Sequence, residues 1–508
     1  MNLREMIGQR MVSGFPGSEM SEEFIQAVKE YKLGNVILFQ HNVRSAAQLK
    51  TLCADIQALV KRETGHPAFI TIDQEGGIVT RLTQDAANVP GAMSLAATGD
   101  PENAEEAAQI TAEQLRALGV NFNLAPVLDV NSNRRNPVIG ARSFGDDPHK
   151  VAQFGVAEVR GMEKGGVLSC AKHFPGHGDT AVDSHIGLPC IDKSLDELEK
   201  CELIPFKAAI EAGIPAVMTT HILFPQIEKT NVPATMSRTI MTGILREKLG
   251  FKGLIISDCM MMKAIADHYG TVNGVGAAMQ AGVDLVFVCH DPNLCCEAMR
   301  AVEAAVQNGT IDKNEMEESA EHIVRVKDKM PPISDAPVGT PEQKRAVRRM
   351  LRASVTLVSG MIPDLGACPA FLGSPSFAST QASNANSSCD AFPAYMQKHI
   401  GGDAFVTPTD PDDAAIAEAV EQAKNHSAIV VSVVSALQRP GQMKLVKALA
   451  ALNLPMVCVS LRVPYELSEM PQGICCLAAY EYNTESLDAV RAVLTQERTP
   501  TGILPVTI

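Results

Sequence analysis

Short apolar runs rich in β-branched residues alternate along the chain with longer segments whose apolar residues recur at helical spacing. Eight such runs precede residue 292: Met11–Phe15, Val36–Phe39, Phe69–Asp73, Phe122–Asp129, Val167–Ala171, Ala216–Thr220, Leu254–Ser257 and Leu285–Cys289. The intervening segments, for example Glu102–Leu118 and Leu195–Glu211, are rich in Ala, Leu and Glu. Strand and helix units in alternation build a parallel sheet, and eight of them predict a (β/α)₈ barrel of the TIM type. We place this barrel at residues 1–332.

A second, smaller domain is predicted after the barrel. Residues 330 to 341 are rich in proline and show no periodicity, so we expect a linker at 333–346. Four further apolar runs alternate with helical segments: Ser354–Val358, Ala428–Val434, Met456–Ser460 and Ile474–Ala478. They predict an α/β sandwich over residues 347–508, with an exposed loop in the Ser/Asn/Ala-rich segment Ser374–Asp390.

Polar residues cluster at the ends of the predicted barrel strands. They fall at or just past the C-terminal end of a strand: Asp73, Asp129, Lys172, His173, His221, Asp258 and His290. Active sites of (β/α)₈ barrels are built at this face. The pattern therefore favours an enzyme.

The densest polar segment is Lys172–His185, which reads Lys-His-Phe-Pro-Gly-His-Gly-Asp-Thr-Ala-Val-Asp-Ser-His. Its residues fit a divalent-metal site of His173, His177, Asp179 and His185, as in an amidohydrolase-like barrel. They also fit acid/base chemistry, with Asp183 orienting the imidazole of His185. A third interpretation is that the histidines only cap and pack the loop. The spacing alone leaves all three open.

Three other sites in the sequence could take part in catalysis or in ligand binding. Asp73 and Glu75 end the third strand, where carboxylates can bind vicinal sugar hydroxyls or form a solvated turn. Asp258 is the first charged residue after a buried strand, an expensive place for a charge that is neither paired nor used. Arg142 lies on the loop after the fourth strand and could bind a ligand oxygen or be an ordinary surface arginine.

Composition narrows the class of protein. The net charge of −14 argues against a nucleic-acid partner, which needs a basic face. Charged residues interrupt the N-terminal segment and no long apolar run is present, so we expect neither an export signal nor a membrane span. Thirteen scattered cysteines in apolar surroundings suggest reduced thiols and a cytoplasmic location. No Gly-rich phosphate motif follows a strand, so we predict no nucleotide cofactor.

Together these residues resemble glycoside hydrolase family 3, in its two-domain β-N-acetylglucosaminidase (β-N-acetylhexosaminidase) branch. The resemblance rests on motifs spread over the chain: Ile72–Gly77, Ala125–Asp129, Gly140–Phe144, Lys172–His185, Ser257–Asp258, Tyr480–Tyr482 and Thr501–Val506. Several ordered motifs over this length make it specific.

The resemblance implies a role for each motif. Asp258 would be the nucleophile, His185 the general acid/base and Asp183 its orienting partner. The residues that would hold the terminal sugar are Asp73, Arg142, Lys172 and His173. His177 and Asp179 would shape the loop, so neither a metal nor another cofactor is expected. Cys259 and Met261 depart from the family's usual side chains, which affects details of the pocket.

The expected activity is retaining hydrolysis of small glycosides with a terminal β-linked N-acetylglucosamine, with cell-wall muropeptides as natural substrates. A β-glucosidase or β-xylosidase of the same family is an alternative, although these lack the Asp-His dyad. A phosphorylase is another, because a histidine repels phosphate less than a carboxylate does. A sugar-binding protein without turnover would have no use for Asp258, Asp183 and His185 together.

Overall fold

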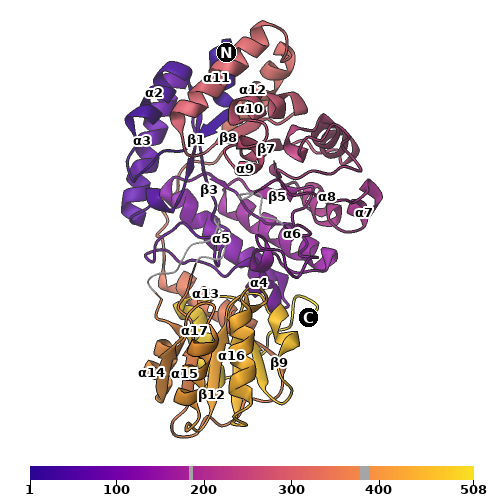
Figure 1. Ribbon diagram of the computed structural model, residues 1–508. Coiled ribbons are helices and arrows are strands. Elements are labelled where there is room, and N and C mark those ends of the chain that lie inside the picture. Colours follow the sequence, from indigo (N-terminus) through magenta and orange to yellow (C-terminus); the bar gives the residue numbers. More distant parts are fainter. Residues whose placement is uncertain (182–186, 378–388) are drawn as a thin grey trace.

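The protein has two domains, shown in the computed structural model of Figure 1, which describes residues 1–181, 187–377 and 389–508. The larger domain is a barrel, and the smaller one packs below it in this view. The predicted fold, a (β/α)₈ barrel followed by a smaller α/β sandwich, is confirmed.

Eight parallel strands form the barrel in the order β4-β3-β2-β1-β8-β7-β6-β5. Their bounds are β1 Met11–Ser13, β2 Asn35–Leu38, β3 Phe69–Ile72, β4 Phe122–Asn123, β5 Cys170–Phe174, β6 Ala216–Thr219, β7 Leu254–Cys259 and β8 Leu285–Val288. Parallel bridges from Phe122 to Leu168 and from Val127 to Lys172 join β4 to β5 and close the ring. Alternate residues point inward, and Val12, Phe69 and Phe287 belong to the apolar cluster that fills its interior.

Helices surround the barrel. Their bounds are α1 Leu3–Gln9, α2 Glu22–Tyr31, α3 Ala46–Thr64, α4 Ala92–Ala97, α5 Pro101–Leu118, α6 Pro148–Gly165, α7 Leu195–Lys200, α8 Leu203–Glu211, η4 Thr239–Lys248, α9 Lys263–Ala266, α10 Thr271–Ala281, α11 Pro292–Gln307 and α12 Lys313–Lys327. Three of them, α5, α6 and α11, begin with an Asp-Pro pair. The aspartate of each pair accepts a hydrogen bond from a first-turn N–H, and proline occupies the first helical position.

Strand β5 differs from the prediction. The sequence placed it at Val167–Ala171, so that Lys172 and His173 would follow its end, whereas both lie within the observed strand. Pairing with β6 starts only at Cys170. The strand continues through two polar residues because both find partners inside the barrel mouth, as described below.

The second domain is a three-layer sandwich around a six-stranded sheet in the order β11-β10-β12-β13-β14-β9, in which only β9 is antiparallel to its neighbour. Its strands are β9 Thr356–Ser359, β10 Ala370–Gly373, β11 Asp403–Val406, β12 Ile429–Val433, β13 Met456–Ser460 and β14 Cys475–Ala478. Its helices are α13 Pro341–Ser354, α14 Phe392–Ile400, α15 Asp413–Ala423, α16 Pro440–Ala450 and α17 Thr484–Leu494. Strands β10 and β11 were not predicted from the sequence. Helix α13 begins at Pro341, so the last six residues of the predicted linker are helical.

Two bulk properties bear on the expectations from composition. All thirteen cysteines are free thiols, and most are buried. In the parts of the chain that the structure describes, no helix combines the length and the apolar character that crossing a membrane requires.

Candidate active site

A cavity of about 400 Å³ opens at the C-terminal ends of the barrel strands. Its polar lining includes Asp73, Glu75, Arg81, Arg142, Lys172, His173, His177, Asp258 and His290. Apolar and sulfur-containing side chains complete it: Phe39, Met218, Cys259, Met261, Phe287 and Cys289. The cavity thus has charged groups facing an apolar wall.

Lys172 is the centre of a buried ion-pair network. Its Nζ atom lies 2.8 Å from Asp73 Oδ1 and 2.6 Å from Glu75 Oε1. Arg142, carried by the short helix η2 (Gly140–Arg142), donates from Nε and Nη2 to the two oxygens of Glu75 at 2.8 and 2.7 Å. Glu75 therefore holds Lys172 and Arg142 in place, and Asp73 keeps one oxygen that Lys172 does not contact.

The charges of this network are fixed at neutral pH. Burial alone would raise the pKa of Glu75, but the cations of Arg142 and Lys172 outweigh it and hold that pKa well below its usual range. Burial would likewise lower the pKa of Lys172, yet the carboxylates of Asp73 and Glu75 raise it. The network consequently presents a fully ionised surface to a ligand.

Asp129 positions two histidines beside this network. Its Oδ2 lies 2.7 Å from His173 Nδ1, and its Oδ1 accepts the backbone N–H of His177 at 2.6 Å. Because a carboxylate only accepts, His173 must carry a proton on Nδ1, which leaves its Nε2 atom as the adaptable one. His177 Nδ1 contacts Thr180 Oγ1 at 2.8 Å, and burial lowers the pKa of His177 to about 4.

Asp258 lies near the end of β7, half-buried at the cavity wall. Its Oδ1 atom accepts the backbone N–H of Cys259 at 2.7 Å, which orients the carboxylate. It lines the same cavity as Asp73 and Lys172, which come from β3 and β5 across the barrel mouth.

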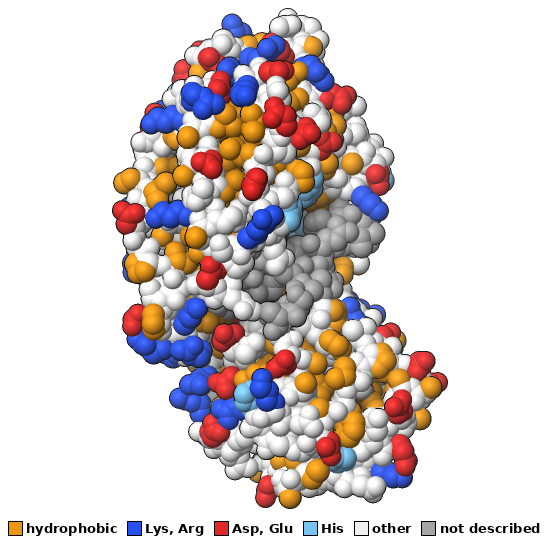
Figure 2. Space-filling view, turned by 90° about the vertical axis from the view of Figure 1, so that its left-hand side faces the viewer, with side chains coloured by type: hydrophobic (Ala, Val, Ile, Leu, Met, Phe, Trp, Pro, Cys, Tyr) orange, Lys and Arg blue, Asp and Glu red, His pale blue; other side chains and the backbone are white. Residues whose placement is uncertain are grey.

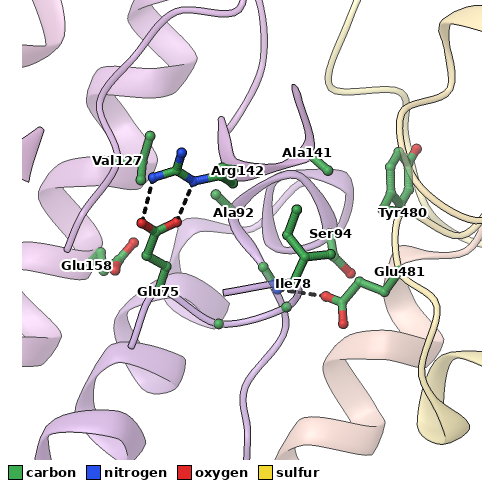
Figure 3. A pocket seen from close by; sticks show the side chains of 13 residues that line it. Glu75, Ile78, Ala92, Ser94, Val127, Ala141, Arg142, Glu158, Tyr480 and Glu481 are labelled. Carbon is green, nitrogen blue, oxygen red and sulfur yellow. Dashed lines mark hydrogen bonds and ion pairs between the residues drawn. The ribbon is translucent and has the colours of Figure 1, made fainter. Parts of the chain in front are cut away.

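A smaller cavity lies behind the Glu75–Arg142 pair, between the barrel and the second domain (Figure 3). Glu158 of α6 lies beside Glu75 there, and burial, with the charge of Glu75 adding to it, raises the pKa of Glu158 to about 8. From the second domain Glu481 accepts the backbone N–H of Gly91 at 2.6 Å. The second domain therefore contacts the same loop that carries Glu75.

The structure brings most of the predicted site residues together. Asp73, Arg142, Lys172, His173 and Asp258 line one cavity. Asp183 and His185 lie outside the described residues, and their roles stay predictions.

The remaining candidate residues, Asp179, His221 and His290, each make different contacts. Asp179, part of the metal alternative, pairs instead with Lys193 at 2.7 Å. His221 is a fully buried histidine bonded to Thr235 and to the carbonyl of Cys259, whereas the ring of His290 packs at a tilt against Phe39 at the cavity.

For three residues of the site the structure shows contacts that the sequence did not indicate. Glu75 was noted only as a second carboxylate, although it joins both cations. Arg81 lines the cavity, and its position four residues after Gly77 gave no periodic signal. Glu481 comes from a domain about 400 residues further along the chain, so only the folded structure shows its contact with Gly91.

The fold and this pocket define a barrel enzyme that binds a small polar ligand, and comparisons with known proteins identify its class. Residues 2–326 match the family model "Glycosyl hydrolase family 3 N terminal domain". A Beta-hexosaminidase A of Pseudoalteromonas piscicida is 31% identical over 91% of this chain and 85% of its own length. A Beta-hexosaminidase of Thiobacillus denitrificans is 38% identical over 56% of this chain and 80% of its own length.

A solved structure of the same family is similar to this chain over its whole length. The glycoside hydrolase family 3 beta-N-acetylglucosaminidase of Paenibacillus sp. str. FPU-7 superimposes with a TM-score of 0.93 at 34% identity, covering 100% of this chain and 99% of that one. The chain therefore belongs to glycosyl hydrolase family 3. It is a glycosidase, and the predicted family is confirmed.

Proposed function

We propose that this protein is a retaining glycosidase that releases terminal β-linked N-acetylglucosamine, with Asp258 as the nucleophile. The observation that carries the proposal is the placement of the Asp258 carboxylate on the same cavity as the Lys172–Asp73 pair and His173. A retaining glycosidase needs a carboxylate below the anomeric carbon of a sugar that other groups hold in register. Similarity to a beta-N-acetylglucosaminidase structure over the whole chain supports the sugar assignment.

The terminal sugar would be held by the polar side of the cavity. Asp73 has an oxygen for a hydroxyl donor, and Lys172 and His173 Nε2 offer further contacts. Arg142 acts mainly through Glu75, since two of its nitrogens are committed to that carboxylate. The apolar wall of Met218 and Phe287 suits the less polar face of a pyranose ring.

Catalysis would proceed in two steps. Asp258 attacks the anomeric carbon while His185 donates a proton to the leaving oxygen, which breaks the glycosidic bond and forms a glycosyl-enzyme ester. His185, now neutral, then takes a proton from water, which attacks the same carbon and regenerates Asp258. A carboxylate at Asp183 would support the protonated imidazole.

The leaving group of the natural substrate would be an anionic cell-wall muropeptide. A hollow of about 680 Å³ lies between the domains and shares Arg81 with the sugar cavity. Lys344, Arg348 and Arg462 also line it. Figure 2 shows Lys and Arg side chains gathered beside the constriction between the domains, where α13 lies. We place this activity in the cytoplasm, where thirteen free thiols would stay reduced.

The first test compares substrates and acceptors. Wild-type protein should cleave nitrophenyl N-acetylglucosaminide much faster than nitrophenyl glucoside, and Asp258→Ala should abolish the burst of nitrophenol. Retention of a burst in Asp258→Ala would exclude it as nucleophile. Running the reaction in phosphate and identifying the product by mass spectrometry separates hydrolysis from phosphorolysis, because only phosphorolysis yields a sugar phosphate.

The second test addresses the muropeptide. Arg348→Gln should raise the KM for a defined muropeptide several-fold and leave the nitrophenyl substrate unaffected, since nitrophenol carries no peptide or carboxylate. Arg345→Gln, on the same helix but outside the hollow, is the matched control. Equal effects of Arg348→Gln on both substrates would contradict the proposed anionic leaving group while leaving the glycosidase assignment intact.

A further inference from the structure

Three potential metal ligands converge at the edge of the second domain's sheet. Cys368 precedes β10, Asp403 begins β11, and His426 precedes β12. These strands are adjacent and parallel in the order β11-β10-β12, so their N-terminal ends lie side by side. One ligand atom from each residue lies within 4.8 Å of the other two, and none of the three side chains belongs to the glycosidase cavity.

The distances match the edges of a tetrahedral zinc site. Cys368 Sγ lies 3.6 Å from Asp403 Oδ2, and His426 Nε2 lies 3.1 Å from the same oxygen. With zinc bonds of about 2.3 Å to sulfur and about 2.0 Å to nitrogen or oxygen, the corresponding edges of a tetrahedron are about 3.5 and about 3.3 Å. Two of the three edges thus fit a zinc site, and the third, from Cys368 Sγ to His426 Nε2, is at most 4.8 Å.

The imidazole is oriented for this role. His426 Nδ1 lies 3.3 Å from the backbone carbonyl of Ala423, an acceptor that fixes the proton on Nδ1 and leaves Nε2 as the ligand. The ring also packs edge-on against Phe405, with centroids 5.6 Å apart. Metal-binding histidines commonly have such an outer hydrogen bond to a carbonyl.

The backbone around the cysteine is held just as firmly. The backbone N–H of Cys368 donates a hydrogen bond to Ser427 Oγ at 3.1 Å, and the Cys368 carbonyl accepts the N–H of Ser427 at 3.0 Å. These bonds hold the backbone of Cys368 in place. Ser427 follows His426 directly, so these two hydrogen bonds tie the backbone of Cys368 to the residue next to His426. The third ligand, Asp403, donates its N–H to the carbonyl of Pro369, next to Cys368.

We propose that Cys368, Asp403 and His426 form a zinc site with an exchangeable fourth ligand, such as water. A thiolate, an imidazole and a carboxylate are the donor types that Zn²⁺ prefers, whereas Mg²⁺ and Ca²⁺ require oxygen ligands. The site joins edge strand β11 to β10 and β12, far along the sheet from the C-terminal strand ends that face the barrel. Its effect is to stabilise this edge of the second domain, and it takes no part in glycoside cleavage.

The experiment is a titration of the full-length, metal-stripped protein with Zn²⁺, followed by calorimetry, and with Co²⁺, followed by absorption. Wild-type protein should bind Zn²⁺ at this site and should show the thiolate-to-cobalt charge-transfer band with tetrahedral Co²⁺ bands. Cys368→Ser and His426→Ala should each weaken Zn²⁺ binding by at least about tenfold, and Cys368→Ser should remove the charge-transfer band.

Cys190→Ser removes the other exposed cysteine and serves as the matched control, which should bind both metals as wild type does. Zn²⁺ should raise the Tm of wild type and Cys190→Ser but not of Cys368→Ser, and turnover of the nitrophenyl substrate should be the same in all three. The absence of a charge-transfer band in wild type, or an undiminished band in Cys368→Ser, would overturn the proposal.

Discussion

Two buried glutamates meet at the loop from Asp73 to Gly91 that follows β3: Glu75 is part of this loop and Glu481 contacts it, and their charges are controlled in opposite ways. Glu75 lies between the cations of Lys172 and Arg142, which keep it ionised. Glu481 reaches the loop from the second domain and accepts hydrogen bonds from Gly91 N at 2.6 Å and Asn483 Nδ2 at 2.6 Å, with Ser94 as a further side-chain donor. Burial therefore raises the pKa of Glu481 to about 7.

The difference separates the functions of the two regions. A carboxylate paired with two cations keeps its charge throughout the range around neutral pH. A carboxylate held by hydrogen bonds alone gains a proton within that range, so the contact it makes depends on pH. The ion-pair network of Glu75 thus keeps its charges near neutral pH, while the contact of Glu481 at the junction between the domains responds to proton concentration.

The largest expected effect comes from removing the central cation of the cavity. Lys172→Met leaves Asp73 and Glu75 buried without one of their counter-charges, and breaking a buried pair in this way costs about 3–5 kcal/mol. We expect kcat/KM for the nitrophenyl substrate to fall at least about a hundredfold, because both sugar contacts and the position of Glu75 are lost. Steady-state kinetics and chemical denaturation measure the two effects.

The control for this variant is Lys164→Met, which removes a surface lysine paired with Glu105. Surface pairs contribute under about 1 kcal/mol, so its stability and kinetics should stay near wild type. A Lys172→Met enzyme with wild-type kcat/KM would show that the ion-pair network does not hold the sugar.

The second prediction concerns the pH dependence of stability. A carboxyl group whose pKa rises from about 4.5 in the unfolded chain to about 7 in the folded one favours folding in its protonated form. Stability from Glu481 is therefore fully present below pH 4.5 and is lost as pH rises to 7, by at most about 3 kcal/mol. In Glu481→Gln this loss should disappear.

Denaturant titrations at several pH values between 5 and 8 provide the measurement. Over this interval the stability of Glu481→Gln should fall less with pH than that of wild type, because the glutamine cannot ionise. Glu469→Gln changes an exposed glutamate of the second domain that does not act on the pKa of Glu481, and it should keep the wild-type slope. Identical slopes for wild type and Glu481→Gln would show that Glu481 is already ionised in the folded protein.

The sequence could predict the barrel because each strand and helix has a local signature. The eight predicted runs overlap the eight strands, and the strand-end residues Asp73, Lys172 and Asp258 do meet at one cavity. The pattern failed where it was weak. Strand β10 reads Ala-Phe-Leu-Gly and has no β-branched residue, and β11 is a half-exposed edge strand that begins with Asp403 and lacks a continuous apolar run.

Contacts between distant segments could not be predicted from local pattern. Nothing near Glu75 in the sequence indicates that it joins Arg142 to Lys172, and nothing near Tyr480 indicates that Glu481 reaches Gly91. Such pairings depend on how β3, β5 and the second domain are placed in space. Family resemblance located the motif Tyr480–Tyr482 in the tail but gave no physical reason for it, which the contact of Glu481 with the loop now supplies.

The smallest expected effect tests whether the junction responds to pH through Glu481 rather than through every contact between the domains. Tyr465 makes an uncharged contact between the domains. Its hydroxyl oxygen accepts a hydrogen bond from Asn131 Nδ2 at 2.7 Å, and burial raises its pKa to about 12, so the hydroxyl stays neutral. Tyr465→Phe should cost about 1 kcal/mol of stability, equally at pH 6 and pH 8.

Tyr480→Phe is the control, because its hydroxyl bonds Thr356 within the second domain at 2.8 Å. Both variants should lose similar stability, but only Tyr465→Phe should alter KM, slightly, through the loop of Asn131 that leads to Arg142. A cost that changed with pH in Tyr465→Phe would mean that the pH response is spread over the whole junction.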